Sequence, residues 1–119
     1  MNIVIIGAGK IGVTLTEQLA REGHNITVID NRAEALTDIG NRLDIMTVRG
    51  NGISIETQTE AGVPQADLLI AVMSTDEQNL LSCLIAKKLG VNNTIARVRN
   101  PEYNSALQLV KEELGLRMA

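Results

Sequence analysis

Hydrophobic positions along the chain fall into two alternating patterns. Short, nearly continuous runs of Ile, Val and Leu are separated by longer stretches in which apolar residues recur every three or four positions. The first pattern is typical of strands buried on both faces, and the second of amphipathic helices. The runs predict strands at residues 2–6, 26–30, 44–48, 67–72 and 94–98.

The stretches between the strands predict helices with recognisable ends. Ile11, Leu15 and Leu19 lie four residues apart on the first helix, which should stop at Gly23. Asn31 is expected to cap the second helix. The predicted helices cover residues 10–22, 32–41, 54–61 and 76–89, with a fifth beginning near residue 101.

The last two predicted helices each carry an apolar stripe, and the stripe of the fourth should be buried. The fourth is expected to be capped by Thr75 or Asp76 and to end at Gly90, and Pro101 suits the first turn of the fifth. The stripes are Leu80, Leu81, Leu84 and Ile85 on the fourth helix, and Tyr103, Leu107, Val110 and Leu114 on the fifth.

Strands that alternate with helices across short connections form βαβ units. The predicted fold class is therefore α/β, with a Rossmann-like, doubly wound parallel sheet in three layers and a single domain over residues 1–119. The chain stops at residues 116–119, where a sixth strand should begin. We therefore expect this domain to be the N-terminal part of a longer protein.

A glycine-rich turn follows the first predicted strand directly. Its sequence is Gly7-Ala8-Gly9-Lys10-Ile11-Gly12, and Asp30 ends the next strand. This is the arrangement of the dinucleotide-binding fingerprint. Gly7 permits the tight turn, Gly9 lets the backbone approach a pyrophosphate, and Gly12 lets the helix pack closely on the sheet. The amides at the start of the helix favour a bound phosphate.

Asp30 can accept hydrogen bonds from both hydroxyls of an adenine ribose. A 2′-phosphate would meet a like charge there, so NAD(H), or alternatively ADP or ATP, is expected in preference to NADP(H). Further candidates lie where the other strands end, because ligands of such sheets bind at that edge. The candidate cofactor-binding residues are Gly7, Ala8, Gly9, Lys10, Ile11, Gly12, Asp30, Asn31, Asn51, Met73, Ser74 and Arg97.

Composition narrows the possible functions. The net charge is −3, with one Tyr and no Phe or Trp, so neither a basic surface nor aromatic platforms indicate nucleic-acid binding. The single Cys fits a reducing cytoplasm. Metal-binding and nucleophile motifs are lacking, His24 is placed at the end opposite the glycine turn, and Cys83 should pack in the core. We therefore predict no catalytic and no metal-binding residues.

Three classes of function fit a nucleotide pocket of this kind. The leading one is a regulatory domain that binds the nucleotide without consuming it. The alternative is the cofactor-binding fragment of an NAD-dependent dehydrogenase, but residue 107, where a Tyr-x-x-x-Lys pair starting at Tyr103 would need lysine, is Leu107. A redox-sensing repressor would need a basic recognition helix, which the sequence does not suggest.

Several segments together resemble a known family. They are the glycine turn, Gly50-Asn51-Gly52, Gly62-x-x-x-Ala66-Asp67, Asp76-Glu77-x-Asn79, and the run from Ala96-Arg97-x-Arg99 to Tyr103. With them the chain resembles, from Met1 to about Leu114, the N-terminal RCK (KTN) domains of Trk-type potassium-uptake regulators, the TrkA family.

The resemblance implies a cytoplasmic domain, peripheral to the inner face of the membrane, that binds NAD(H) or ADP/ATP and gates a membrane potassium transporter. It also implies a homodimer or a higher ring. Relatives bind nucleotide at positions matching Gly7 to Gly12, Asp30, Met73-Ser74 and Arg97, and some sense the terminal phosphate of ATP with a basic residue at the position of Lys10. We hypothesise that the number of phosphates sets how neighbouring domains pack.

Overall fold

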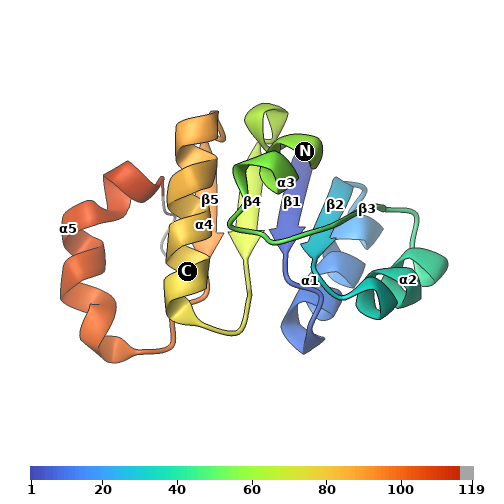
Figure 1. The fold of residues 1–119 in the computed structure, drawn as a ribbon, viewed down its shortest axis with the longest axis horizontal. Helices are drawn as coiled ribbons and strands as arrows, with labels where there is room; N and C mark the ends of the chain where they lie inside the picture. Colours follow the sequence, from blue (N-terminus) through green and yellow to red (C-terminus); the bar gives the residue numbers. More distant parts are fainter. Residues whose placement is uncertain (116–119) are drawn as a thin grey trace.

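The structure, a computed structural model, describes residues 1–115 and contains one parallel sheet of five strands. The strand order is β3-β2-β1-β4-β5 (Figure 1). The chain adds β2 and β3 on one side of β1 and then β4 and β5 on the other side. The strands are β1 (Asn2–Ile6), β2 (Asn25–Asp30), β3 (Met46–Arg49), β4 (Leu68–Ala71) and β5 (Asn93–Ala96). The predicted fold class is confirmed. The expected sixth strand at 116–119 lies outside the described residues.

Helices follow the strands as expected. They are α1 (Lys10–Arg21), α2 (Ala33–Arg42), α3 (Ile55–Glu60), α4 (Asp76–Leu89) and α5 (Asn104–Leu114), with 3-10 turns η1 (Val63–Gln65) and η2 (Pro101–Tyr103). Pro101 begins η2 rather than α5, since the chain makes a tighter turn before the helix. Within residues 1–115, no helix is long and apolar enough to cross a membrane.

The two faces of the sheet carry separate hydrophobic cores. Side chains alternate along β1, so that Val4 and Ile6 pack under α3 and α4, while Ile3 and Ile5 face α1 and α2. Ile5 and Val28 are fully buried. This burial on both sides explains why the strands are continuous apolar runs and not alternating ones.

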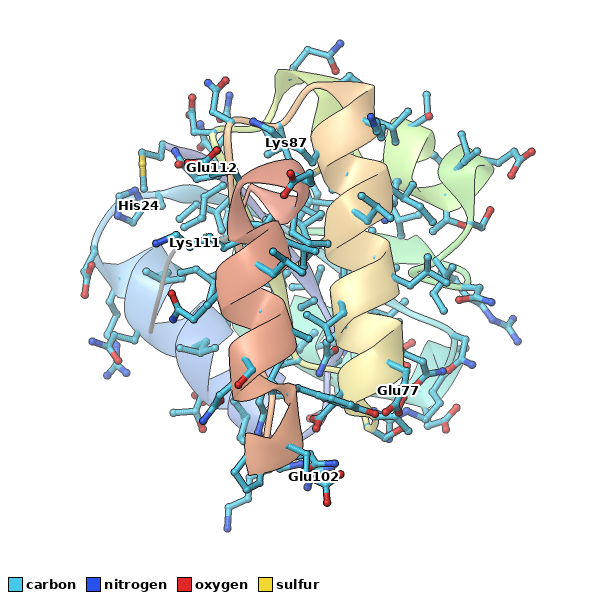
Figure 2. The ribbon with its side chains drawn as sticks, turned by 90° about the vertical axis from the view of Figure 1, so that its left-hand side faces the viewer. His24, Glu77, Lys87, Glu102, Lys111 and Glu112 are labelled. Atoms are coloured by element: carbon cyan, nitrogen blue, oxygen red, sulfur yellow. The ribbon has the colours of Figure 1, made fainter. Side chains whose placement is uncertain are left out.

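Helix α5 lies beside α4 at the β5 edge of the sheet (Figure 2). Tyr103, just before α5, donates its hydroxyl hydrogen to Glu77 near the start of α4. At the other end of α5, the backbone oxygens of Leu114 and Gly115 accept hydrogen bonds from the side chain and amide of Thr94 at 2.9 and 2.8 Å. The first contact joins the segment after β5 to the start of α4, and the other two join the end of α5 to β5.

Two further local predictions were wrong. The predicted buried stripe of α4 is only half-buried, and Leu81 is 45% exposed; smaller side chains, including Asn79, Ser82, Cys83 and Ala86, face the sheet because the helix packs close to it. Asn31 does not cap α2. The N-cap position is Arg32, whose side chain makes no capping bond and whose amide donates to Asp30.

Candidate functional site

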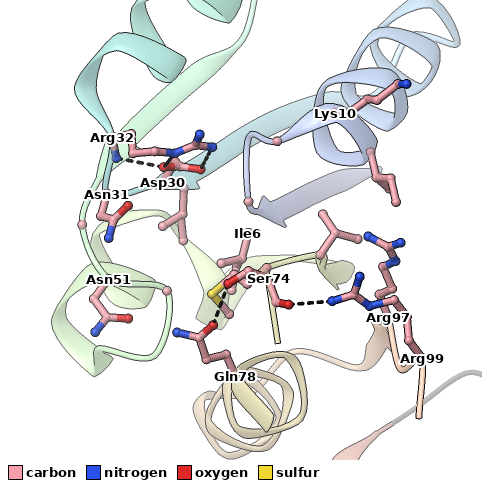
Figure 3. Close-up of a pocket in the computed structure, with 18 residues that line it drawn as sticks. Ile6, Lys10, Asp30, Asn31, Arg32, Asn51, Ser74, Gln78, Arg97 and Arg99 are labelled. Carbon is pink, nitrogen blue, oxygen red and sulfur yellow. Dashed lines mark hydrogen bonds and ion pairs between the residues drawn. The ribbon is translucent and has the colours of Figure 1, made fainter. Parts of the chain in front are cut away.

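A pocket of about 790 Å³ opens at the carboxyl edge of the sheet, between β1 and β4, where the two halves of the sheet meet. Such crevices are where ligands of open α/β sheets bind, and the volume is in the range of small-molecule sites. The loops after all five strands contribute to it (Figure 3).

The glycine turn forms the floor of the pocket and is closely packed. Gly7 has φ +116°, and a Cβ there would lie 2.7 Å from the backbone oxygen of Val72. A Cβ on Gly12 would lie 1.8 Å from the backbone oxygen of Gly7. By contrast, no atom of residues 1–115 lies within 4 Å of a Cβ built on Gly9, which lines the pocket. Two glycines are therefore required for packing, and the third leaves space for a ligand.

Helix α1 begins at this turn with its amino end toward the pocket. Its N-cap residue is Gly9, and no side chain caps it; its first turn contains no acidic residue. The amides of the first turn and the helix dipole therefore present partial positive charge to the pocket. Lys10, the first helical residue, adds a full charge, so this end of the pocket suits a phosphate group.

Asp30 ends β2 and is held by four hydrogen bonds. One carboxylate oxygen accepts from the amide of Ala8 at 2.7 Å and from Arg32 Nη2 at 3.1 Å. The other accepts from the amide and Nε of Arg32 at 2.8 and 3.1 Å. Burial favours the neutral acid, but the bonds from Arg32 and Ala8 outweigh it and hold the pKa of Asp30 below its usual value. Asp30 is thus an anion paired with Arg32.

Across the pocket from Asp30, the backbone is held by the side chain of Asn79. Its Oδ1 accepts from the amide of Met73 at 2.6 Å, and its Nδ2 donates to the backbone oxygens of Met73 and Arg97 at 3.3 and 2.8 Å. Arg99 Nη2 donates to the backbone oxygen of Ser74 at 2.7 Å. Asn79 is 1% exposed, so it fixes the loops after β4 and β5 from beneath the pocket.

The charges of the pocket oppose those of the whole chain. Among the residues that the structure describes, its lining contains the cations Lys10, Arg32, Arg97 and Arg99 and one anion, Asp30, whereas the chain has a net charge of −3. Lys10, Arg97 and Arg99 lie on one side and the Asp30–Arg32 pair on the other (Figure 3). A ligand with several negative charges therefore matches this site better than a neutral one.

The structure brings nearly all the predicted site residues together. All of them except Ala8 and Gly12 line the pocket, although contact with a ligand stays a prediction. The side chain of Ala8 is buried while its amide binds Asp30, and Gly12 is buried against Gly7. The sequence analysis did not select Arg32. Its position two residues after Asp30, close enough for an ion pair, could have identified it.

The lone cysteine and the lone histidine of the chain are not among the residues that line the pocket. Cys83 is fully buried, as predicted, and burial raises the pKa of its thiol to about 12. His24 accepts a hydrogen bond from the N-terminal amine of Met1 at 3.1 Å, and it precedes β2, at the edge opposite the pocket. No group of His, Cys, Asp and Glu within the described residues could hold a metal ion.

Asp76 offers a test of how the loop after β5 is held. Its carboxylate accepts from the amides of Arg99 and Asn100 at 2.9 and 2.8 Å, which lowers its pKa below the usual value. A lowered folded-state pKa stabilises the fold above the unfolded-state pKa, and this contribution is lost as pH falls through the folded-state value. Asp76→Asn should therefore lower the melting temperature at pH 7, and the difference from wild type should shrink toward pH 3.

The matched control is Glu60→Gln, which removes a carboxylate from an exposed position on α3. It should leave the melting temperature close to that of wild type. A melting-temperature difference for Asp76→Asn that is the same at pH 7 and pH 3 would contradict the role given to these two amides.

The chain is similar to proteins of potassium uptake systems. Residues 3–115 match the family described as the TrkA-N domain. The chain is 41% identical over 104 residues to the Trk system potassium uptake protein TrkA of Vibrio alginolyticus, covering 87% of this chain and 23% of that protein. It is 37% identical over 110 residues to the TrkA homolog of Methanothermobacter thermautotrophicus, covering 92% and 51% respectively.

Among solved structures, the chain is similar to the GsuK channel bound to NAD, with a TM-score of 0.80 and 23% identity. The match covers 97% of this chain and 20% of that one. At this identity the similarity shows a common fold.

Proposed function

Because the chain belongs to the TrkA-N domain family, we propose that it is a regulatory domain that binds NAD(H), or alternatively ADP or ATP, and gates a membrane potassium transporter. The observation that carries the proposal is the pocket itself. It combines an uncapped helix start at Gly9, an anionic Asp30 and a cationic lining in a chain of net negative charge.

The pocket residues suit the parts of an adenine nucleotide. The α1 amides would hold the diphosphate, and the Asp30 side of the pocket would take the adenine ribose. Lys10, Arg97 and Arg99, on the opposite side, would hold a terminal phosphate. Among the described residues, the pocket lining includes no Tyr-Lys pair of the kind that short-chain dehydrogenases use. We therefore propose that the nucleotide is bound and not consumed.

The names of the relatives support the transport role. The chain spans 23% and 51% of the lengths of the two TrkA relatives, so the activity and partners of a whole protein belong to the proposal. We infer that residues 1–119 form the N-terminal domain of a longer cytoplasmic regulator, peripheral to the membrane, which assembles as a homodimer or a higher ring. The binding of NAD by the similar GsuK channel supports the choice of ligand class.

Gating requires that the nucleotides stabilise two states to different extents. ADP or NAD(H) would leave the Lys10 side of the pocket less engaged, whereas ATP adds phosphate charge there. The loops after β4 and β5, which carry Ser74, Arg97 and Arg99, are hydrogen-bonded to α4 through Asn79 and Asp76. A charge bound at these loops can therefore bias the position of α4 relative to the sheet.

Titration calorimetry with NAD, NADH, ADP and ATP tests the proposal. Asp30→Ala should weaken all four ligands, because each carries the same adenosine ribose. Lys10→Ala should chiefly weaken ATP, by about tenfold, because a charge-assisted bond to the added phosphate is lost.

Lys88→Ala, at an exposed position near the end of α4, is the matched control and should bind all four ligands as wild type does. Equal losses for every ligand in Lys10→Ala would show that the assigned role of this lysine is wrong. Absence of binding by the wild-type protein would overturn the proposed function.

A further inference from the structure

Arg32 occupies acceptor positions on the Asp30 carboxylate that a ribose would otherwise use. A carboxylate has about four lone-pair positions, and the four N–H bonds from Ala8 and Arg32 occupy those of Asp30. Two of the four come from the guanidinium. A ribose diol that donates both hydroxyl hydrogens to Asp30 must therefore displace donors already in place.

The guanidinium is the donor that can leave. The side chain of Arg32 is 52% exposed, whereas that of Asp30 is 7% exposed. The amides of Ala8 and Arg32 belong to the glycine turn and to the start of α2, so neither can move away without rebuilding the backbone. A diol would thus bind Asp30 at the cost of two charge-assisted bonds.

A phosphate on the ribose would instead contact the guanidinium of Arg32. A guanidinium has five N–H donors, and the Asp30 pair uses one on Nε and one on Nη2. Within residues 1–115, the Nη1 group and the second Nη2 hydrogen make no hydrogen bond and remain available on a half-exposed side chain that lines the pocket. Arg32 can therefore hold Asp30 and a phosphate oxygen together, and its charge offsets the repulsion that Asp30 alone would exert on that phosphate.

We propose that Arg32 determines the ribose selectivity of the pocket, so that it accepts an adenine nucleotide with a 2′-phosphate as well as one with a free 2′,3′-diol. The inference rests on the proposed nucleotide-binding function. It differs from the expectation based on Asp30 alone, in which a carboxylate excludes the 2′-phosphate. Arg32 acts as a competitor toward the diol and as a ligand toward the phosphate.

Calorimetric titration with NADH and NADPH tests this selectivity, since the two differ only at the adenine 2′ position. Wild type should bind both, with dissociation constants within about tenfold of each other. Arg32→Gln should tighten NADH and weaken NADPH, raising the ratio of the NADPH to the NADH dissociation constant by about tenfold or more. Adenosine 2′,5′-bisphosphate and 5′-AMP should show the same change without the nicotinamide half.

Arg42→Gln is the matched control, because it also removes an ion-paired arginine from α2 but at the opposite end of the helix. It should leave the ratio unchanged. A ratio unaffected by Arg32→Gln, or a wild type that binds NADH but not NADPH, would overturn the role of Arg32 and leave the proposed function standing. A wild type that binds none of these nucleotides would overturn both.

Discussion

Gly12→Ala should destabilise the whole domain, whereas Gly9→Ala, three residues earlier in the same turn, should leave it folded. In a helix, alanine is ordinarily favoured over glycine by about 1 kcal/mol. At Gly12 the added Cβ would lie 1.8 Å from the backbone oxygen of Gly7 and 2.8 Å from its carbon, and neither atom can rotate away. The cost should reach about 3 kcal/mol or more, a large part of the stability of a small domain.

Gly9 has backbone angles that alanine adopts, φ −79° and ψ −167°, and no atom in the described part of the chain lies within 4 Å of its Cβ position. The added methyl group would project into the space proposed for the diphosphate. Gly9→Ala should therefore melt as wild type does but bind ADP and NADH at least about tenfold more weakly. Thermal melts and calorimetry of both variants separate packing from binding, and a Gly12→Ala protein with wild-type stability would contradict the described contact between α1 and the turn.

The pattern of apolar residues was sufficient to predict five strands in a parallel sheet. Continuous apolar runs fit few arrangements other than strands buried on both faces. Ile5 and Val28 must be buried on one face of the sheet, while their neighbours in the sequence are buried on the other. The glycine turn was equally informative, since Gly7 and Gly12 are each required by a backbone atom within 3 Å of the missing Cβ. Once strand ends were placed, the edge that carries the pocket followed from the parallel arrangement.

The wrong prediction for α4 concerns contacts between segments that are far apart in the sequence. The leucines of α4 form an apolar stripe in sequence, but Asn79 and Ser82 are buried in preference to Leu81 because they hydrogen-bond to loops far along the chain or within the helix. Periodicity cannot show such partners. The Asp30–Arg32 pair is local, yet the two residues straddle the end of a strand, and their approach depends on how the chain turns there.

Asn79→Asp should be among the most damaging changes that preserve side-chain shape. The amide nitrogen of Asn79 donates to the backbone oxygens of Met73 and Arg97, and the substitution replaces this donor with an oxygen that faces both of them. Since the site is 1% exposed, the new charge would be neither solvated nor paired. A loss of about 3 kcal/mol in unfolding free energy is expected at neutral pH, from the orphaned bonds and the buried charge.

The loss of stability in Asn79→Asp should depend on pH. Burial next to carbonyl oxygens raises the pKa of the introduced carboxyl above its unfolded-state value, so the native state binds the proton more strongly. The variant should lose stability as pH rises and recover part of it toward pH 4.5, where the protonated acid can donate to one of the two oxygens. Urea unfolding at pH 8 and pH 4.5 measures the change. Asn92→Asp, at an exposed position before β5, should show no comparable loss at either pH; a loss for Asn79→Asp that does not vary between the two would mean that the amide does not bridge the loops beneath the pocket.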